Sequence, residues 1–413
     1  MTRNGKRHTV QTNSPAVLGG RPMFDKPVAI TRPTIPSIRD LKSAYGRILK
    51  SGIITNAGYV REFEQKLSQY LGVRNVVAVS SCTSGLMLMM KVLGLKGEVI
   101  VPSFTFHSTV HAIVWVGLKP VFVDCGAKTF TINCEEVKKA ITPQTCAILA
   151  VHIFGNPCSI KPLEQIAKKH GLKLIFDAAH GFGAEYHGAR LGRFGTAEIF
   201  SLSPTKLLTA GEGGIVATND DQLAQKIRIG RNYGDPGTYE CEFSGFNARM
   251  SEFHALLGIS SLGDLEKNVI KRRKLVALYK SLLADVPGIS FQKIEPDSQS
   301  SFKDFSILVD KEKFGLDRDV LAECLKQENI IVKKYFYPPV HTQRAFAKYY
   351  HKKYAHSLAQ TNMIAENILS LPLYSHMPES CVRGIYNSIK KIYQNKTAIR
   401  SLYPNLNKES KRQ

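Results

Sequence analysis

The chain has 413 residues, of which 43% are apolar and 22% charged, and no apolar run reaches the ~18 residues that a membrane span needs. The net charge of +22 would suit a nucleic acid or an anionic substrate, but the basic residues are spread along the chain without a helix-turn-helix, zinc-finger or RNA-recognition signature. We therefore expect a globular, cytoplasmic protein with no membrane or nucleic-acid partner. Nucleic-acid binding is the alternative, which only the net charge suggests.

The first part of the chain predicts an arm followed by two helices. Residues 1–25 lack periodicity and are predicted to form a flexible arm. Helices are predicted over residues 37–51, where Gly52 ends the helix, and over residues 60–71, where apolar side chains recur at a helical spacing.

Seven short apolar runs then alternate mostly with helices. Strands are predicted at residues 76–79, 99–101, 120–123, 147–151, 174–176, 198–200 and 214–217, and helices at 84–93, 108–116, 135–140 and 160–170. Near-continuous apolar strands joined by helices predict an α/β fold, with a mainly parallel seven-stranded sheet covered on both faces. Ligands of such sheets bind at the carboxyl ends of the strands.

The pattern changes after about residue 262. A long helix is predicted over residues 265–284, followed by apolar segments at 302–309 and 330–332 with flanking helices. We therefore expect a large domain over residues 26–262, a smaller C-terminal α+β domain over residues 263–404 and a disordered tail over residues 405–413.

Eight cysteines are scattered along the chain, and none forms a C-x-x-C pair. In a long chain without a signal core, this spacing predicts reduced thiols and neither a disulfide framework nor a metal site.

An acid and a lysine carry the main chemical signal. Asp177 ends the apolar run 174–176, and Lys206 lies in a short loop before the glycine-rich run 211–214. A buried carboxylate is costly without a cationic partner, and the protonated ring nitrogen of pyridoxal phosphate (PLP) is such a partner. A lysine near glycines that permit close approach suits the Schiff base that holds the PLP aldehyde. A helix cap at Asp177 and a surface position for Lys206 are the plainer alternatives.

Three further segments would suit the same cofactor. Residues 80–85 are small and open a helix, which favours phosphate binding, although a simple helix cap explains them as well. Phe106 follows the second strand and would either stack on a planar cofactor or pack in the core. His180 would either bond the 3′ oxygen of PLP or serve a structural role.

Together these segments resemble a known family. From about residue 33 to residue 392 the chain is similar to the nucleotide-sugar aminotransferases of the DegT/StrS type, within the fold-type-I PLP superfamily. The matching stretches are residues 81–86, 101–106, 120–124, 152–155, 177–180, 203–206, 211–214, 231–234 and 245–252. The resemblance implies a three-layer α/β fold with PLP as cofactor.

The resemblance also implies a role for each residue. Lys206 would hold PLP and shuttle the proton, Asp177 would bind the ring nitrogen, and Phe106 would stack on the ring. The phosphate would be bound by Cys82, Thr83, Ser201 and, from the neighbouring chain, Asn247. That last role implies a homodimer with shared active sites. The family most often has glutamine where His180 stands, but imidazole can bond the same 3′ oxygen.

The activity implied is the transfer of an amino group from L-glutamate to a nucleotide-linked keto sugar. A dTDP- or UDP-linked 4-keto-6-deoxyhexose is expected, giving an amino sugar for a surface polysaccharide, O-antigen or antibiotic. A 3-keto sugar aminotransferase and a PLP-dependent sugar dehydratase or lyase are the alternatives. Family members that act as dehydratases carry histidine where Lys206 stands, so lysine favours transamination. Candidates for the sugar diphosphate, by position only, are Arg231, Lys333, Lys334 and Tyr335.

Overall fold

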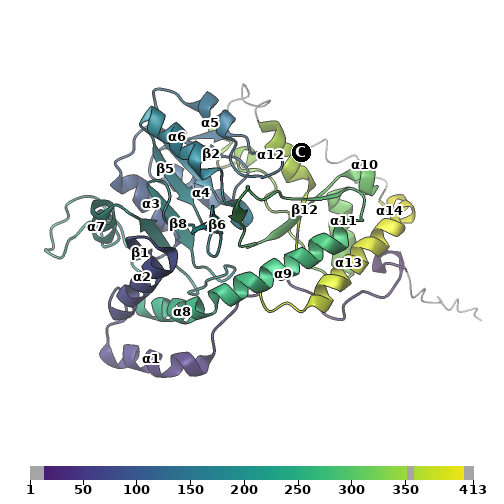
Figure 1. Cartoon of the computed structure of the whole chain (residues 1–413), viewed down its shortest axis with the longest axis horizontal. Coiled ribbons are helices and arrows are strands. Elements are labelled where there is room, and N and C mark those ends of the chain that lie inside the picture. The colour runs from purple at the N-terminus through teal and green to yellow at the C-terminus, as the bar shows by residue number, and fades with distance from the viewer. Residues whose placement is uncertain (1–13, 351–357, 404–413) are drawn as a thin grey trace, which may run out of the picture.

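The computed structural model describes residues 14–350 and 358–403. Residues 1–13 of the predicted arm and the predicted tail at 405–413 lie outside these ranges. The described residues form one seven-stranded sheet and two three-stranded sheets, with helices packed around them (Figure 1).

The large sheet contains all seven strands that the sequence predicts. They are β1 (Asn75–Val79), β2 (Glu98–Pro102), β3 (Lys119–Val123), β4 (Thr145–Val151), β5 (Lys173–Asp177), β8 (Ala197–Ser201) and β9 (Gly214–Thr218). Their order is β1-β9-β8-β5-β4-β2-β3, and β9 runs antiparallel to both of its neighbours while the other pairs are parallel. The predicted mainly parallel sheet is therefore confirmed.

Helices cover both faces of this sheet, because alternate strand residues enter different hydrophobic clusters. The helices are α1 (Ile38–Ser51), α2 (Gly58–Leu71), α3 (Cys82–Val92), α4 (His107–Trp115), α5 (Cys134–Ala140), α6 (Ile160–His170), α7 (Asp221–Gly230) and α8 (Glu252–Gly263). Val76 and Ala78 belong to a cluster that also contains residues of α2, α5, α6 and α8, whereas Val77 and Val79 belong to one that contains residues of α3, α4 and α7. The result is the predicted three-layer arrangement of helix, sheet and helix.

A second hydrophobic cluster lies in the C-terminal part of the chain. The long helix α9 (Leu265–Leu283) runs from α8 to α13 (Glu379–Gln394), as Figure 1 shows. It packs with an antiparallel sheet of order β10-β12-β13. These strands are β10 (Ile289–Phe291), β12 (Phe305–Val309) and β13 (Ile368–Leu371). The remaining helices here are α10 (Lys311–Phe314), α11 (Arg318–Gln327), α12 (Ala359–Asn367) and α14 (Lys396–Leu402).

The apolar segment 330–332 does not form a strand, because Ile330 makes an isolated bridge to Val28 and Lys333 makes another to Ser370. The third strand is instead β13. The predicted domain boundary at residue 262 stays a prediction and lies where α8 passes into α9.

The described part of the predicted arm is held against the C-terminal part. The backbone N–H groups of Ala16 and Met23 donate to the fully buried carboxylate of Glu328, at 2.8 and 2.7 Å. Two short antiparallel pairings complete the strands, with β6 (Glu185–Tyr186) between β7 (Ala189–Arg190) and β11 (Ser298–Gln299).

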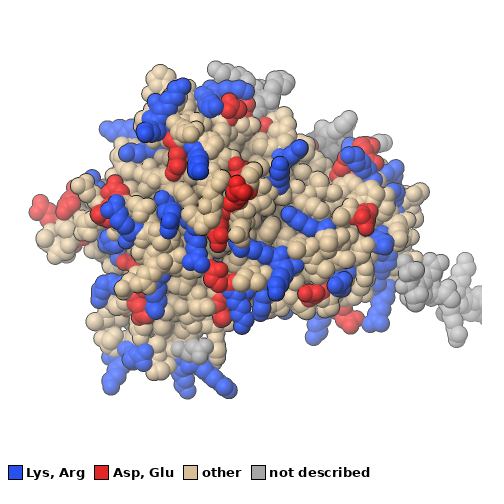
Figure 2. Space-filling view, viewed as in Figure 1, with Lys and Arg blue, Asp and Glu red and all other residues tan. Residues whose placement is uncertain are grey.

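Basic side chains are distributed over the surface. On the face shown in Figure 2, lysine and arginine side chains lie over all parts of the molecule, with acidic side chains among them. None of the helices in the described ranges has the length and apolar character needed to cross a bilayer.

Candidate active site

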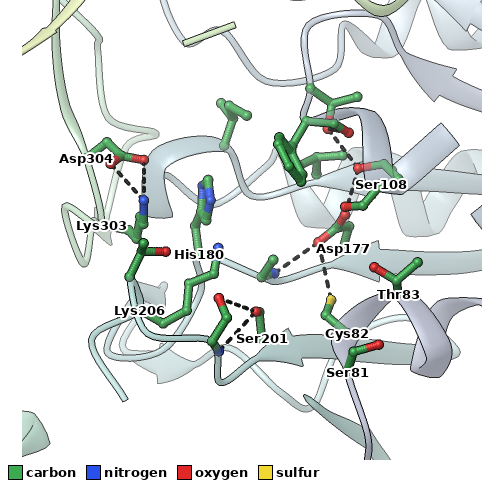
Figure 3. A pocket seen from close by; sticks show the side chains of 18 of the residues that line it. Ser81, Cys82, Thr83, Ser108, Asp177, His180, Ser201, Lys206, Lys303 and Asp304 are labelled. Atoms are coloured by element: carbon green, nitrogen blue, oxygen red, sulfur yellow. Dashed lines mark hydrogen bonds and ion pairs between the residues drawn. The ribbon is translucent and has the colours of Figure 1, made fainter. Parts of the chain in front are cut away.

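A cavity of about 350 Å³ opens at the carboxyl ends of the central strands (Figure 3). Its walls come from the segments after β1, β2, β5 and β8 and from the C-terminal part of the chain. Asp177 and Lys206 both line it, which places the two residues of the main chemical signal in one site. This volume suits a small organic molecule.

Asp177 is a buried carboxylate without a cationic partner. Its side chain is 3% exposed, and it accepts hydrogen bonds from the Thr109 hydroxyl at 2.8 Å and from the Ala179 N–H at 3.0 Å. Among the described residues it forms no ion pair with a lysine or arginine. Burial raises the pKa of Asp177, although these two hydrogen bonds and the charge of Lys206 act against the rise. The carboxylate is therefore ready for a cationic ligand atom.

Lys206 reaches the cavity from the loop between β8 and β9 (Figure 3). Its ammonium has no hydrogen bond or ion pair within the described ranges. Burial, and after it the charge of Lys303, lowers the pKa of Lys206 to about 8, against the opposing charges of Asp304 and Asp177. A lysine with such a pKa is a usable nucleophile and base near neutral pH.

His180 is neutral and has a defined tautomer. Its Nδ1 accepts the backbone N–H of Phe154 at 3.1 Å, and the two rings lie nearly parallel. Burial, followed by the charges of Lys206 and Lys303, lowers the pKa of His180 well below its ordinary value. Because Nδ1 is an acceptor, Nε2 carries the proton and is the donor available to a ligand.

The amino end of α3 forms one corner of the cavity. Ser81 caps the helix and exchanges hydrogen bonds with Ser84, which fixes its first turn. The first N–H groups of a helix have no acceptor within it and attract anions. A Cβ on Gly214 would lie 2.5 Å from the Cys82 nitrogen, so glycine is required for β9 to approach this corner. Thr83 and Ser201 line the same corner and offer hydroxyl groups.

Most of the predicted cofactor residues meet in the cavity. Its lining includes Cys82, Thr83, Phe106, Asp177, His180, Ser201 and Lys206. The Cys82 thiol is buried and points to the Asp177 carboxylate, 3.9 Å away, so only its backbone is placed to meet an anion at the helix end. Phe106 remains 46% exposed at the rim. Asn247 is exposed and does not line the cavity of its own chain.

Only one of the four residues predicted to bind the sugar diphosphate lies in the cavity wall. Tyr335 lines the cavity, but Lys333 and Lys334 do not, and Lys334 pairs with Asp319 at 2.6 Å. Arg231 also lies outside the lining, in a buried ion pair with Glu64. Arg231 as a substrate ligand is therefore a wrong prediction, because its guanidinium is already used inside the large core.

We expect Arg231→Met to destabilise the protein without affecting substrate binding. The substitution leaves Glu64 buried without its counter-ion, which costs roughly 3–5 kcal/mol. The free energy of unfolding in urea should fall by this amount, while the KM of the sugar substrate stays unchanged. The double variant with Glu64→Gln should recover much of the loss. A raised KM with unchanged stability would return Arg231 to the substrate site.

Several residues of the site were missed from the sequence. Thr109 and Ser108 lie in the first turn of α4, and Lys303, Asp304 and Phe336 come from the C-terminal part. Two adjacent charges before the apolar run of β12 were a visible signal for Lys303 and Asp304. Nothing in the sequence connected them to Lys206.

Comparison with known proteins identifies the family of this chain. The model of the DegT/DnrJ/EryC1/StrS aminotransferase family matches residues 38–390. The chain belongs to this family. Two relatives are each described as a dTDP-4-amino-4,6-dideoxy-D-glucose transaminase. The one from Escherichia coli is 33% identical over 362 residues, covering 87% of this chain and 97% of the relative. The one from Shigella dysenteriae is 33% identical over 370 residues, covering 89% and 100%.

Two solved structures share the fold of this chain. DesI, determined in the presence of its TDP-sugar product, matches with a TM-score of 0.88 and 34% identity, covering 96% of this chain and 100% of DesI. DesV from S. venezuelae, in complex with a ketimine intermediate, matches with a TM-score of 0.82 and 30% identity, covering 89% and 99%. The predicted fold-type-I aminotransferase architecture is thereby confirmed.

Proposed function

We propose that this protein is a PLP-dependent aminotransferase that moves the amino group of L-glutamate to a nucleotide-linked keto sugar. The observation that carries the proposal is one cavity in which a lysine of lowered pKa and a buried carboxylate without a cation both face the ligand space. The family membership and the sugar transaminases among the relatives support the same activity.

The residues present fit PLP. Asp177 would hold the proton of the ring nitrogen, Lys206 would bind the aldehyde carbon, and the Nε2–H of His180 would donate to the phenolic oxygen. Thr83, Ser201 and the amino end of α3 would bind the phosphate. When bound, the cofactor accepts the electron pair released at the reacting carbon.

Lys206 then performs the proton transfers. Its Nζ would take the proton from the α-carbon of the donor and return a proton to the sugar carbon that gains the nitrogen. With a pKa lowered to about 8, the amine can both take up and release a proton near neutral pH, as the two directions of transfer require. Asp177, held by Thr109 and Ala179, would keep the ring nitrogen protonated throughout.

We propose a dTDP- or UDP-linked 4-keto-6-deoxyhexose as the acceptor, because two relatives are named for a dTDP-4-amino-4,6-dideoxy sugar. Tyr335 at the cavity wall, and Lys333 and Lys334 outside it, are the candidates for contacts with the sugar nucleotide. The test is incubation with L-glutamate and a panel of dTDP- and UDP-linked 4-keto and 3-keto sugars, with the product identified by NMR. A product that carries its new amine only at C3 would show that the acceptor is a 3-keto sugar and not a 4-keto sugar.

We further propose a homodimer with shared sites. Apolar side chains stand exposed around α1, including Ile38 and Leu49 at 67% and 68%, and Ile53 at 60%, which is an apolar surface that a second copy could cover. Asn247 of the partner subunit would complete the phosphate site, since its own chain leaves it outside the cavity. A cytoplasmic location is supported by eight free cysteines, which suit a reducing compartment.

A heterodimer of two inactive variants should be active if Asn247 acts across the interface. Lys206→Ala and Asn247→Asp would be co-expressed with different affinity tags and purified through both. One of the two sites then contains neither substitution, so the heterodimer should keep about half of the wild-type activity. Each homodimer should be far less active. An inactive heterodimer would place Asn247 and Lys206 in the same chain's site.

A further inference from the structure

A pair of adjacent, oppositely charged residues lies in the cavity wall next to Lys206. Lys303 and Asp304 are only 5% and 7% exposed, and both line the cavity. The Lys303 ammonium donates to both carboxylate oxygens of Asp304, at 2.9 and 3.1 Å. Figure 3 shows this pair on the side of Lys206 and His180, away from Asp177.

The backbone that carries the pair is firmly held. The N–H of Lys303 donates to the Phe154 carbonyl at 3.0 Å, and the Ser301 hydroxyl donates to the His180 carbonyl at 2.8 Å. On the other side, the buried Arg272 donates to the Lys303 carbonyl at 2.8 Å. The ammonium of Lys303 is therefore a fixed feature of the cavity and not the end of a mobile surface side chain.

In this wall of the cavity, the cations Arg272 and Lys303 outnumber the single carboxylate Asp304. Arg272 is 1% exposed and bonds to carbonyls and to the Ser375 hydroxyl, and it forms no ion pair with a carboxylate in the described part of the chain. Burial lowers the pKa of Arg272 to about 10, so it stays charged at neutral pH, and Asp304 is the acid whose charge favours this. Two cations, Arg272 and Lys303, thus share one carboxylate. A buried positive charge without a counter-ion favours an anionic ligand.

We infer that Lys303 binds the α-carboxylate of the amino donor, with Asp304 as its counter-ion when the donor is absent. The inference rests on the proposed aminotransferase function. The reacting carbon must lie at Lys206, and the α-carboxylate is bonded directly to that carbon. Among the described residues that line the cavity, Lys206 and Lys303 are the only lysines or arginines. Since Lys206 handles the proton, Lys303 is the cation left for the carboxylate.

The Lys303–Asp304 pair would also allow one cavity to accept both a substrate with a carboxylate at the reacting carbon and a substrate without one. The donor places a carboxylate beside the reacting carbon, whereas the keto sugar places only ring carbons and hydroxyl groups there. An isolated lysine would be left without a counter-ion in the sugar half of the reaction. In the half-reaction with the sugar, Asp304 alone neutralises Lys303. In the half-reaction with the donor, Lys303 interacts with both Asp304 and the donor's α-carboxylate.

The test compares Lys303→Gln with the wild-type holoenzyme in each half-reaction separately. Glutamine keeps a donor to Asp304 but removes the charge. The apparent dissociation constant of L-glutamate, from stopped-flow absorbance of the cofactor, should rise roughly 10- to 100-fold, the effect of losing a charged hydrogen bond. The constant for the amino sugar product, measured in the reverse half-reaction, should change less than about threefold. Lys313→Gln, an exposed lysine paired with Asp310, is the matched control.

A binding measurement without chemistry completes the test. Glutarate, a dicarboxylate without an amino group, should bind the wild-type holoenzyme in calorimetry and bind Lys303→Gln at least about tenfold more weakly. Thermal unfolding of the variant should show that it is folded. Unchanged constants for glutamate and glutarate would overturn the inference and leave the aminotransferase function standing. Equal losses in both half-reactions would also overturn it, because Lys303 would then serve both substrates alike and not the carboxylate of the donor. A wild-type enzyme that reacts with neither substrate would refute the proposed function itself.

Discussion

Replacing Lys206 with alanine is expected to lower transamination by at least about 10⁴-fold, because one substitution removes both the covalent anchor of the cofactor and the proton-transfer group. Lys303, the other lysine among the described residues that line the cavity, is not placed to take over, since it is held by Asp304 on a separate segment of backbone. Steady-state turnover with L-glutamate and the keto sugar measures the loss.

The covalent anchor can be observed independently of turnover. Borohydride reduction of the wild-type holoenzyme, followed by peptide mass spectrometry, should find the cofactor attached at Lys206. The exposed lysine variant Lys271→Ala should behave as the wild type in both experiments. Cofactor attached to a different lysine, or turnover within tenfold of the wild type in Lys206→Ala, would contradict the assignment.

Replacing Asp177 with asparagine is expected to lower activity without lowering the stability of the cofactor-free protein. The amide keeps the shape of the side chain but cannot hold the ring nitrogen protonated, so turnover should fall roughly 10²- to 10³-fold, as when another preorganised electrostatic group is removed. Burial raises the pKa of Asp177, so its ionised form opposes folding at neutral pH in the absence of the cofactor. The cofactor-free variant should therefore be at least as stable as the cofactor-free wild type.

Thermal unfolding of both cofactor-free proteins checks the stability, and turnover checks the activity. Because the pKa of Asp177 is raised, the free-energy cost of folding with this carboxylate ionised is absent at low pH. The cost grows as the pH rises to the folded-state pKa of Asp177. The stability difference between variant and wild type should therefore shrink in acid. Asp285→Asn, an exposed acid, is the control. A variant that is strongly destabilised, or one with full activity, would show that Asp177 serves the fold and not the cofactor.

The large sheet could be predicted from the sequence because its strands are buried on both faces. Val76 to Val79 and residues 174–176 are short continuous apolar runs, and their length favours buried strands over helices. Asp177 was recognisable because it directly follows such a run, and Lys206 because it lies in a short loop between two of them, before a glycine-rich stretch. Strand ends at one sheet edge then place them together.

The rest of the site depends on contacts between distant segments. Lys303 and Asp304 enter the cavity only because Arg272 and the Phe154 loop hold their backbone there. Arg231 looked available for a diphosphate, but Glu64, 167 residues away in sequence, takes its guanidinium. In the C-terminal part, β13 was missed because its few residues follow a helix without a turn signal.

The most direct test of the proposed function follows the nitrogen atom itself. The purified protein with PLP would be incubated with ¹⁵N-labelled L-glutamate and dTDP-4-keto-6-deoxyglucose, and the products examined by ¹⁵N and ¹H NMR. A transaminase built around Lys206 and Asp177 predicts a dTDP-linked 4-amino-4,6-dideoxy sugar whose amine carries ¹⁵N, with one 2-oxoglutarate formed for each. Release of ¹⁵N-labelled ammonia without an amino sugar, or no consumption of either substrate, would contradict it.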